Sequence, residues 1–446
     1  MPGKAKVVFG DVLNSNPFVS INDTVKVSIP GMFQGKNCKL NLNDELLSKH
    51  LLLIGGTGCG KTNVMFLIIK HLKKSMTPND VMIIFDTKGD FYKEFYVPAD
   101  KVISNSKQYA DKSEKWNIFR EIAADGWEND AIIMNANEIT YSLFYDAISK
   151  NNSNPFFPQA ARDLFASILI QEMRNGSIPN PNIKIQPELY KKKFLNNAVL
   201  QASLNSLSVP MLKNWITSPD LQSIFTYTGD GDNTQGLGVL AELQYVIRQV
   251  LIGEFAQQGF FSMRNFVKKK GAKTLFIEYD LSLGSMLAPI YRILFDLALK
   301  EAMGRTKTEG NIYLICDEFK LLPNLQHIED AVNFGRSLGV KVIAGLQSIK
   351  QLQEIYGDDK ATNIIAGFSS LFAFRMNDTS SREYISKLYG ENYTIDEHLS
   401  LGNKIIEKER SGKTVEDWDL NLLRTGDAVI GLNDNRPFQF KFDLYK

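Results

Sequence analysis

Cysteine and histidine are among the residues that this chain has in shortest supply. Among 446 residues there are three cysteines and four histidines. The cysteines, Cys38, Cys59 and Cys316, are far apart and form no Cys-x-x-Cys pair, which argues against a zinc site and against a disulfide framework. The histidines show no metal-ligand spacing. This composition favours a protein of the reducing cytosol.

Long apolar runs are missing as well. No apolar run approaches the roughly 18 residues that a membrane-spanning helix needs, and the first residues, Met1-Pro2-Gly3-Lys4, lack a signal-peptide core. We therefore expect no transmembrane helix, a cytoplasmic location, and contact with a membrane only through other proteins. A net charge of +1 excludes a global field as the basis of nucleic-acid binding, which would need local basic surface instead.

The rest of the composition is that of a globular protein, with 44% hydrophobic and 23% charged residues. Apolar, strand-like runs alternate with helical segments in the first and last parts of the chain, whereas helical periodicity dominates between them. This pattern predicts an α/β domain with a doubly wound, mostly parallel sheet, interrupted by an inserted all-α domain. The expected division is 1–125 and 269–446 for the α/β domain and 126–268 for the insertion.

The predicted elements follow from these patterns. Buried strands are expected at 51–54, 81–85, 274–279, 311–316, 340–346 and 371–375, with further strands near 428–432 and 438–440. Helices are expected at 131–148, 156–173, 187–202, 203–216, 236–255, 286–303, 328–338 and 379–389.

The strongest motif is Gly55-Gly56-Thr57-Gly58-Cys59-Gly60-Lys61-Thr62, which has the G-x-x-x-x-G-K-T spacing of a P-loop. It lies between a predicted strand and a predicted helix, as a P-loop does. Glycines let backbone N–H groups surround phosphate oxygens, and the following helix adds its positive dipole end. Lys61 is expected to reach the β- and γ-phosphates of ATP, and the Thr62 hydroxyl to hold Mg²⁺. The motif therefore predicts a nucleotide site.

Two acidic residues, Asp317 and Glu318, follow the apolar run 311–316, which is the pattern of a Walker B motif. Asp317 is expected to hold Mg²⁺, because a carboxylate suits that hard cation. Glu318 is expected to polarise the attacking water as general base. Acidic pairs also end strands without any such role, but the P-loop in the same chain favours the catalytic interpretation. Together these motifs indicate a RecA-like P-loop ATPase.

Gln347 directly follows the apolar run 340–346. A side-chain amide at this place can contact the γ-phosphate or the attacking water, so we interpret Gln347 as a sensor of the nucleotide. A polar cap of the strand is the alternative.

Arg375 ends the apolar run that begins at Leu371. A charge inside such a strand is costly unless it is paired or reaches an interface. The hypothesis is an arginine finger that acts in trans on the nucleotide of a neighbouring subunit. A salt bridge within the subunit is the alternative, and Arg336 and Arg382 compete for the same role.

Two further features stay open. The segment 86–90, Asp-Thr-Lys-Gly-Asp, lies off the end of a predicted strand, where a doubly wound sheet binds ligands, although a simple polar turn has the same pattern. The runs Lys191-Lys192-Lys193 and Lys268-Lys269-Lys270 could contact phosphates of DNA, but short lysine runs are more often solvated.

Several of these segments resemble a known family. The stretch from Ser48 to Gly58 looks like the entry to the P-loop in the FtsK/HerA class of DNA-pumping ATPases. Further segments are similar, in the same order, to the type IV secretion coupling proteins of bacterial conjugation: 85–90, 116–119, 156–164, 317–319, 345–348 and 374–379. The resemblance extends from about residue 48 to 440.

The resemblance implies a homo-hexamer that binds ATP between its subunits and moves DNA, with its attached relaxase, toward a type IV secretion channel. It implies the roles given above for the P-loop residues, the Walker B pair, Gln347 and Arg375. The all-α domain would meet DNA-processing proteins. Coupling proteins usually begin with a pair of transmembrane helices, and the sequence given contains none. Either such a segment has been removed from a longer protein, or a separate membrane protein docks the chain at the inner face of the bacterial membrane.

Three other functions are compatible with parts of the pattern. Another FtsK/HerA-type translocase, for chromosome or phage DNA, would share the same catalytic residues. A nucleotide-gated receptor for protein cargo would bind ATP without pumping, but it would not need Glu318 as a base. A small-molecule kinase fits poorly, because the acidic pair and Gln347 suit water activation better than acceptor positioning.

Overall fold

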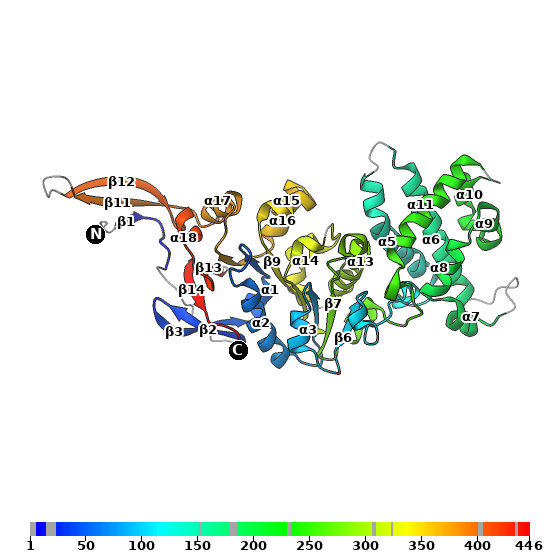
Figure 1. Cartoon of the computed structure of the whole chain (residues 1–446), viewed down its shortest axis with the longest axis horizontal. Helices are drawn as coiled ribbons and strands as arrows, with labels where there is room; N and C mark the ends of the chain where they lie inside the picture. Colours follow the sequence, from blue (N-terminus) through cyan, green and yellow to red (C-terminus); the bar gives the residue numbers. More distant parts are fainter. Residues whose placement is uncertain are drawn as a thin grey trace.

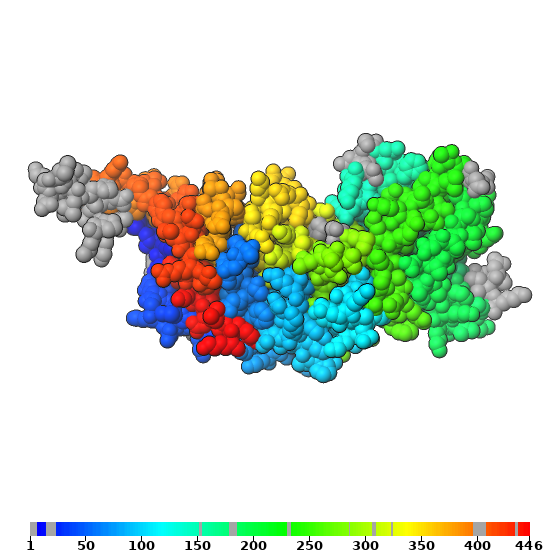
Figure 2. Space-filling model, viewed as in Figure 1, coloured from blue at the N-terminus to red at the C-terminus, as the bar shows by residue number. Residues whose placement is uncertain are grey.

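The computed structural model describes residues 6–14, 24–150, 154–177, 185–229, 233–305, 309–322, 324–399, 405–432 and 436–446. The molecule is elongated (Figure 1). An α/β body lies in the middle, a block of helices lies at one end, and a small sheet extends from the other. Figure 2 shows the green helical block as a lobe of its own beside the body.

The body is built on one sheet with the strand order β3-β2-β14-β13-β10-β4-β9-β8-β5-β7-β6. In this order, all neighbouring strands from β10 to the edge strand β6 are parallel. The strands on the other side of β10, which are β13, β14, β2 and β3, are antiparallel to their neighbours. The bounds are β2 Val25–Phe33, β3 Lys36–Asn43, β4 Leu51–Ile54, β5 Val81–Asp86, β6 Lys101–Ser104, β7 Lys273–Glu278, β8 Ile312–Cys316, β9 Val340–Leu346, β10 Ser370–Phe374, β13 Asp427–Leu432 and β14 Phe438–Phe442.

The two ends of the chain build this sheet together. Strands β2 to β6 precede the helical block in sequence, and β7 to β10, β13 and β14 follow it. The predicted fold class, a mostly parallel α/β sheet interrupted by an all-α insertion, is therefore confirmed. The domain boundaries at 125 and 268 stay a prediction.

Helices cover both faces of the sheet, which explains why its central strands are apolar throughout. In β5, Met82 and Ile84 pack in one cluster with helix α2 (Lys61–Ser75). The alternate residues Ile83 and Phe85 pack on the other face with helix α13 (Gly284–Met303). Because successive side chains of a strand point to opposite faces, a sheet covered on both faces needs continuous apolar runs.

The remaining helices of the body are short and connect the strands. They are α1 Asp44–Ser48, α3 Asp90–Phe95, α4 Ile118–Ile122, α14 Ile328–Phe334, α15 Ile349–Tyr356, α16 Asp358–Ala366, α17 Thr379–Leu388 and α18 Asp417–Asn421.

The helical block contains α5 Asn129–Lys150, α6 Phe156–Ser177, α7 Pro187–Phe194, α8 Asn197–Asn205, α9 Val209–Trp215, α10 Phe225–Thr228, α11 Thr234–Val250 and α12 Met263–Lys269. The single helix predicted over 187–202 is wrong. It breaks before Asn196, whose side chain accepts a hydrogen bond from the N–H of Val199 (3.1 Å) and so caps a new helix, α8. The helix predicted over 203–216 is wrong at its start, since α9 begins at Val209.

The small sheet was not predicted from the sequence. It consists of β1 Lys6–Phe9, β11 Glu391–Leu399 and β12 Ile405–Lys413, in the order β1-β11-β12. It extends away from the body (orange and dark blue in Figure 1). Within the described ranges, no helix is both long enough and apolar enough to span a membrane.

Candidate nucleotide site

The P-loop connects β4 to α2 with the backbone geometry that its glycines allow. Gly58 and Gly60 have φ values of 72° and 113°, which L side chains rarely adopt. Gly60 is the N-cap of α2, and no side chain caps the helix there. The N–H groups of the first turn are therefore available to phosphate oxygens at the positive end of the helix dipole.

Lys61 and Thr62 begin helix α2. The buried Lys61 Nζ donates hydrogen bonds to the carbonyl oxygens of Gly55 (2.6 Å) and Gly56 (3.2 Å). The Thr62 hydroxyl donates to Oδ2 of Asp317 (3.0 Å). The fold thus joins the P-loop to the residue after β8, which lies 255 positions later in the chain.

Asp317 and Thr62 form a set of hard oxygen atoms. Asp317 is 5% exposed, and burial raises the pKa of its carboxyl, although the hydroxyl of Thr62 lowers it. A carboxylate so poorly hydrated gains from a nearby cation. A carboxylate and a hydroxyl are ligands that suit Mg²⁺, so the residues present fit this ion.

Glu318 and Gln347 lie side by side after neighbouring strands. The Gln347 Nε2 donates to both carboxylate oxygens of Glu318, at 2.9 and 3.1 Å. Both side chains are half-buried. The structure therefore brings together Lys61, Thr62, Asp317, Glu318 and Gln347, as the sequence predicted. Their catalytic roles stay predictions.

Arg375 lies elsewhere than the sequence suggested. Strand β10 ends at Phe374, so Arg375 is exposed and is not a charge inside an apolar strand. That part of the interpretation is wrong, because the strand ends one residue earlier. The carbonyl oxygen of Arg375 accepts a hydrogen bond from the N–H of Gly56 (2.8 Å), which places the residue beside the P-loop of its own chain.

The two competing arginines are paired within the subunit. The Arg382 Nε donates to Asp417 (2.7 Å), and its Nη1 donates to two carbonyl oxygens of the same region. Arg336 lies 3.5 Å from Glu45, and both side chains are more than half exposed, so this pair is weak. Arg382 is the competitor that the fold excludes more clearly.

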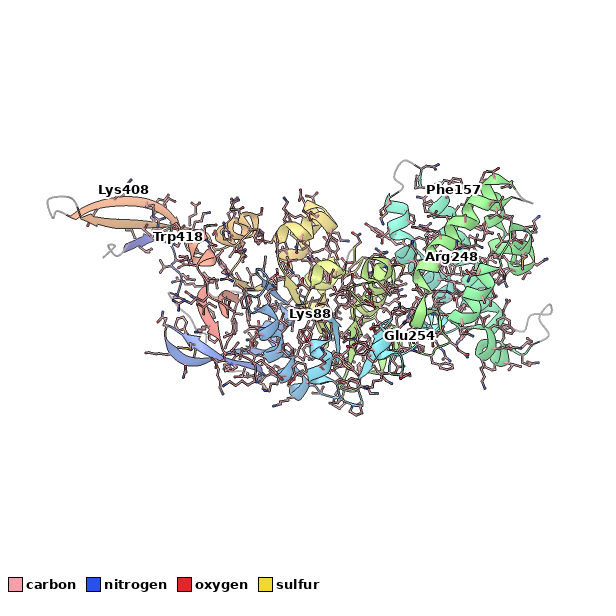
Figure 3. All side chains as sticks on the ribbon, in the orientation of Figure 1. Lys88, Phe157, Arg248, Glu254, Lys408 and Trp418 are labelled. Atoms are coloured by element: carbon pink, nitrogen blue, oxygen red, sulfur yellow. The ribbon has the colours of Figure 1, made fainter. Side chains whose placement is uncertain are left out.

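The segment 86–90 forms an ordered turn, and its part in a ligand site stays a prediction. The buried Asp86 accepts hydrogen bonds from the N–H groups of Lys88 (3.2 Å), Gly89 (2.9 Å) and Tyr92 (2.9 Å). Gly89 has φ 70°. This loop presents the exposed Lys88 (labelled in the α/β body in Figure 3) at the carboxyl ends of the parallel strands. The loop therefore lies at the same edge of the sheet as the P-loop.

A second carboxyl group, which the sequence analysis missed, lies beside Asp86. Glu278 ends β7 in register with Asp86 and is 3% exposed. Burial and then the charge of Asp86 raise the pKa of Glu278 to about 9, so this side chain is protonated at neutral pH. Only the order of the strands brings the two carboxyl groups together, so no local sequence signal could have shown the pair.

Replacing Glu278 with glutamine is expected to stabilise the protein increasingly as the pH rises. The folded state holds a proton on Glu278 up to a pKa of about 9, whereas the unfolded chain releases it near 4.3, so folding loses stability between these values. Glu278→Gln mimics the protonated form and escapes this loss, which amounts to at most about 1.4 kcal/mol per pH unit. Urea unfolding of both proteins at about pH 5 and about pH 8 measures the difference.

The matched control is Glu383→Gln, since Glu383 is exposed on α17. Its effect on unfolding should be small and the same at both pH values. A constant difference between Glu278→Gln and the original chain across this range would contradict the raised pKa.

Comparison with known proteins shows to which family this chain belongs. A family model described as the type IV secretion-system coupling protein DNA-binding domain matches residues 36–416. The chain belongs to this family. The family predicted from the sequence segments is thereby confirmed.

Individual relatives are distant. The coupling protein TraD of Escherichia coli K12 is 22% identical over 385 residues, which cover 83% of this chain and 48% of TraD. The conjugal transfer protein TraG of Agrobacterium fabrum is 28% identical over 178 residues, covering 38% of this chain and 27% of TraG. The chain thus spans about half or less of the curated relatives that it matches.

Solved structures share the fold. The plasmid coupling protein TrwB, in complex with the ATP analogue ADPNP, matches with a TM-score of 0.73 and 19% identity, over 100% of this chain and 96% of that one. VirB4 of Thermoanaerobacter pseudethanolicus matches with a TM-score of 0.56 and 11% identity, over 96% and 98%. At these identities the comparison establishes the arrangement of the elements.

Proposed function

We propose that this chain is an ATP-hydrolysing motor that translocates DNA, with its attached relaxase, and couples it to a type IV secretion channel in conjugation. The observation that carries the proposal is the composite site. Hydrogen bonds from Thr62 to Asp317 and from Gln347 to Glu318 join three separate parts of the chain, one of which is the P-loop.

Each residue has a separate task in this mechanism. The P-loop N–H groups and Lys61 hold the β- and γ-phosphates of ATP, and Lys61 leaves its present carbonyl partners to do so. Thr62 and Asp317 would hold Mg²⁺, which neutralises charge that develops on the phosphates. Glu318 accepts the proton of the attacking water, and Gln347 keeps this carboxylate in place.

The relatives support nucleotide and DNA as ligands. Structures of TrwB are described with ADPNP and with ADP and Mg²⁺, so ATP and Mg²⁺ are the expected cofactors here. The family description names a DNA-binding domain. TraD and TraG are named for coupling and conjugal transfer, which favours conjugation over chromosome or phage DNA.

We also propose a homo-hexamer in which Arg375 reaches the nucleotide of the adjacent subunit. Its side chain is exposed and forms no ion pair among the residues that the structure describes. Action on the P-loop of its own chain is the alternative, since Gly56 contacts its carbonyl oxygen. Mixing Arg375→Ala with Lys61→Ala subunits separates the two, because only an arginine acting in trans restores activity. Recruitment to the inner face of the membrane by a partner protein stays part of the proposal.

The function is tested by ATP hydrolysis of the purified chain with and without single- and double-stranded DNA. We expect hydrolysis, with a rate that DNA raises, and only background in a Lys61→Ala preparation. Absence of turnover under every condition would favour the nucleotide-gated receptor. Turnover that DNA never changes would exclude DNA translocation.

A further inference from the structure

Helices α6, α7, α8 and α9 surround a cavity of about 320 Å³ in the helical block. It lies at the end of the molecule, away from the P-loop before α2 (Figure 1), so the nucleotide site does not explain it. Its lining combines aromatic rings with a carboxylate and an amide: Phe119, Tyr190, Phe194, Trp215, Glu172 and Asn175.

Glu172 is a buried carboxyl group with no basic side chain paired to it among the described residues. It is 8% exposed and accepts hydrogen bonds from Trp215 Nε1 (2.6 Å) and from the Tyr190 hydroxyl (2.8 Å). Burial raises the pKa of Glu172, whereas the two donors lower it. Because each carboxylate oxygen accepts two hydrogen bonds, both oxygens keep room for a further donor.

The aromatic rings form a stacking surface beside this carboxylate. Tyr190 and Phe194 lie one turn apart on α7, with ring centroids separated by 4.8 Å. Trp215 is partly exposed, and its indole N–H points to Glu172. Such a surface can stack on any nucleobase, because every base has a flat aromatic face. The carboxylate beside it adds selectivity for a ligand with donors.

Two exposed lysines lie on α7, the helix that also carries Tyr190 and Phe194. Lys192 and Lys193 are exposed on α7 and make no ion pair among the described residues. The Lys193 Nζ lies 5.4 Å from the ring centroid of Phe194, which lines the cavity. In contrast, Lys268 of the second lysine run is paired with Asp125 and Glu301. Such basic side chains repel a lysine- or arginine-rich peptide and attract phosphates.

We propose that this cavity binds one unpaired guanine of single-stranded DNA. Guanine presents two adjacent donors, N1–H and N2–H, which match the two oxygens of Glu172, and its rings stack on the aromatic side chains. Adenine and cytosine present one amino group each, beside an acceptor that the carboxylate repels. Lys192 and Lys193 contact the flanking phosphates. The inference rests on the proposed function only in taking DNA as the substrate.

The base preference is measured without ATP, so that failure of the motor and failure of this site can be told apart. Fluorescence anisotropy compares oligothymidylates of about 13 nucleotides with thymine, guanine or hypoxanthine at the centre. Hypoxanthine lacks the N2 amino group. We expect guanine to bind about tenfold more tightly than thymine, with hypoxanthine between them. Equal binding of all three would overturn the proposal.

Two variants test the contribution of the Glu172 carboxylate and that of the lysines separately. Glu172→Gln should abolish the preference for guanine while the oligothymidylate still binds. The double variant Lys192→Ala, Lys193→Ala should weaken the binding of every oligonucleotide alike. It should also reduce the steepness of the plot of log K against log[salt] by about 1.4. Glu188→Gln, an exposed carboxylate on the same helix, is the matched control for the loss of a carboxylate and should leave the preference for guanine unchanged.

Cross-linking tests the site in the original chain, so it does not depend on whether Glu172→Gln destabilises the fold. An oligonucleotide with a photoreactive guanine should cross-link to the original chain at Tyr190, Phe194 or Trp215, as identified by mass spectrometry of the peptides. Cross-links confined to other regions would overturn the proposal. Displacement of the oligonucleotide by equimolar dGMP would assign the cavity to a free nucleotide, and displacement by a basic peptide would assign it to a protein; either result contradicts it.

Discussion

Glu318→Gln is expected to lower the rate of ATP hydrolysis by about 10²–10⁴-fold while ATP still binds. Glutamine has nearly the same shape as glutamate but cannot take the proton of the attacking water. The hydrogen bond from Gln347, 2.9 Å long in the original chain, can still hold the new side chain at position 318 in place. The substitution should therefore lower turnover and not binding. The hydrogen bonds described for the Glu318 carboxylate come from Gln347 and not from the P-loop, so the affinity for ATP should stay within a small factor.

Two measurements on the same preparation test this separation. Steady-state hydrolysis gives turnover, and equilibrium binding of a fluorescent ATP analogue gives affinity. Lys61→Ala is the reference for the opposite behaviour, since it removes the contact with the phosphates and should lose binding as well as turnover. Turnover of Glu318→Gln within about threefold of the original chain would show that Glu318 is not the general base.

Glu121→Leu is expected to destabilise the fold by about 3–5 kcal/mol, because each buried hydrogen-bond donor left without an acceptor costs about 1–3 kcal/mol. Glu121 on α4 is 0% exposed. It accepts hydrogen bonds from Trp116 Nε1 (2.8 Å), the Ser262 hydroxyl (2.8 Å), the N–H of Met263 (2.5 Å) and the N–H of Arg264 (3.2 Å). Leucine fills the space but leaves these donors buried without an acceptor.

The loss of stability in Glu121→Leu should first appear as local opening around Glu121. Trp116 precedes the helical block and Ser262 is the N-cap of α12, its last helix, so Glu121 ties together the segments by which the chain enters and leaves the block. Urea unfolding measures the total loss, and hydrogen exchange should show reduced protection of α12 first. Glu128→Leu, at an exposed position nearby, should change the free energy of unfolding by less than about 0.5 kcal/mol. A loss below about 1 kcal/mol in Glu121→Leu would mean that the donors find other partners.

The parts of the fold that could be predicted have a common physical origin. The central strands lie in a sheet covered on both faces, so that residues such as Ile83 and Ile84 are both buried and the run is apolar throughout. The strands β11 and β12 carry many charged residues and have no apolar pattern from which they could be predicted. The break at Asn196 was missed because a helix cap depends on one side chain and not on periodicity.

The same distinction holds for the sites. The P-loop is contiguous and its function depends on local backbone geometry, so spacing alone predicts it. Asp317, Glu318 and Gln347 each follow an apolar run, and parallel strands bring their carboxyl ends to one edge. The buried carboxyl groups Glu278 and Glu172 could not be predicted, because each has its partners on other elements and no pattern of its own.

The amino-acid sequence by itself determined the class of protein, the P-loop, the acidic pair and the family, because these depend on residue types at short spacing or in a fixed order. The tertiary structure decided which distant residues meet: Thr62 with Asp317, Asp86 with Glu278, and Glu172 with Trp215. It also moved Arg375 from the interior of a strand to an exposed position beside the P-loop. The physical reason is that burial, hydrogen bonding and pKa depend on neighbours in space, which strand order and helix packing bring together.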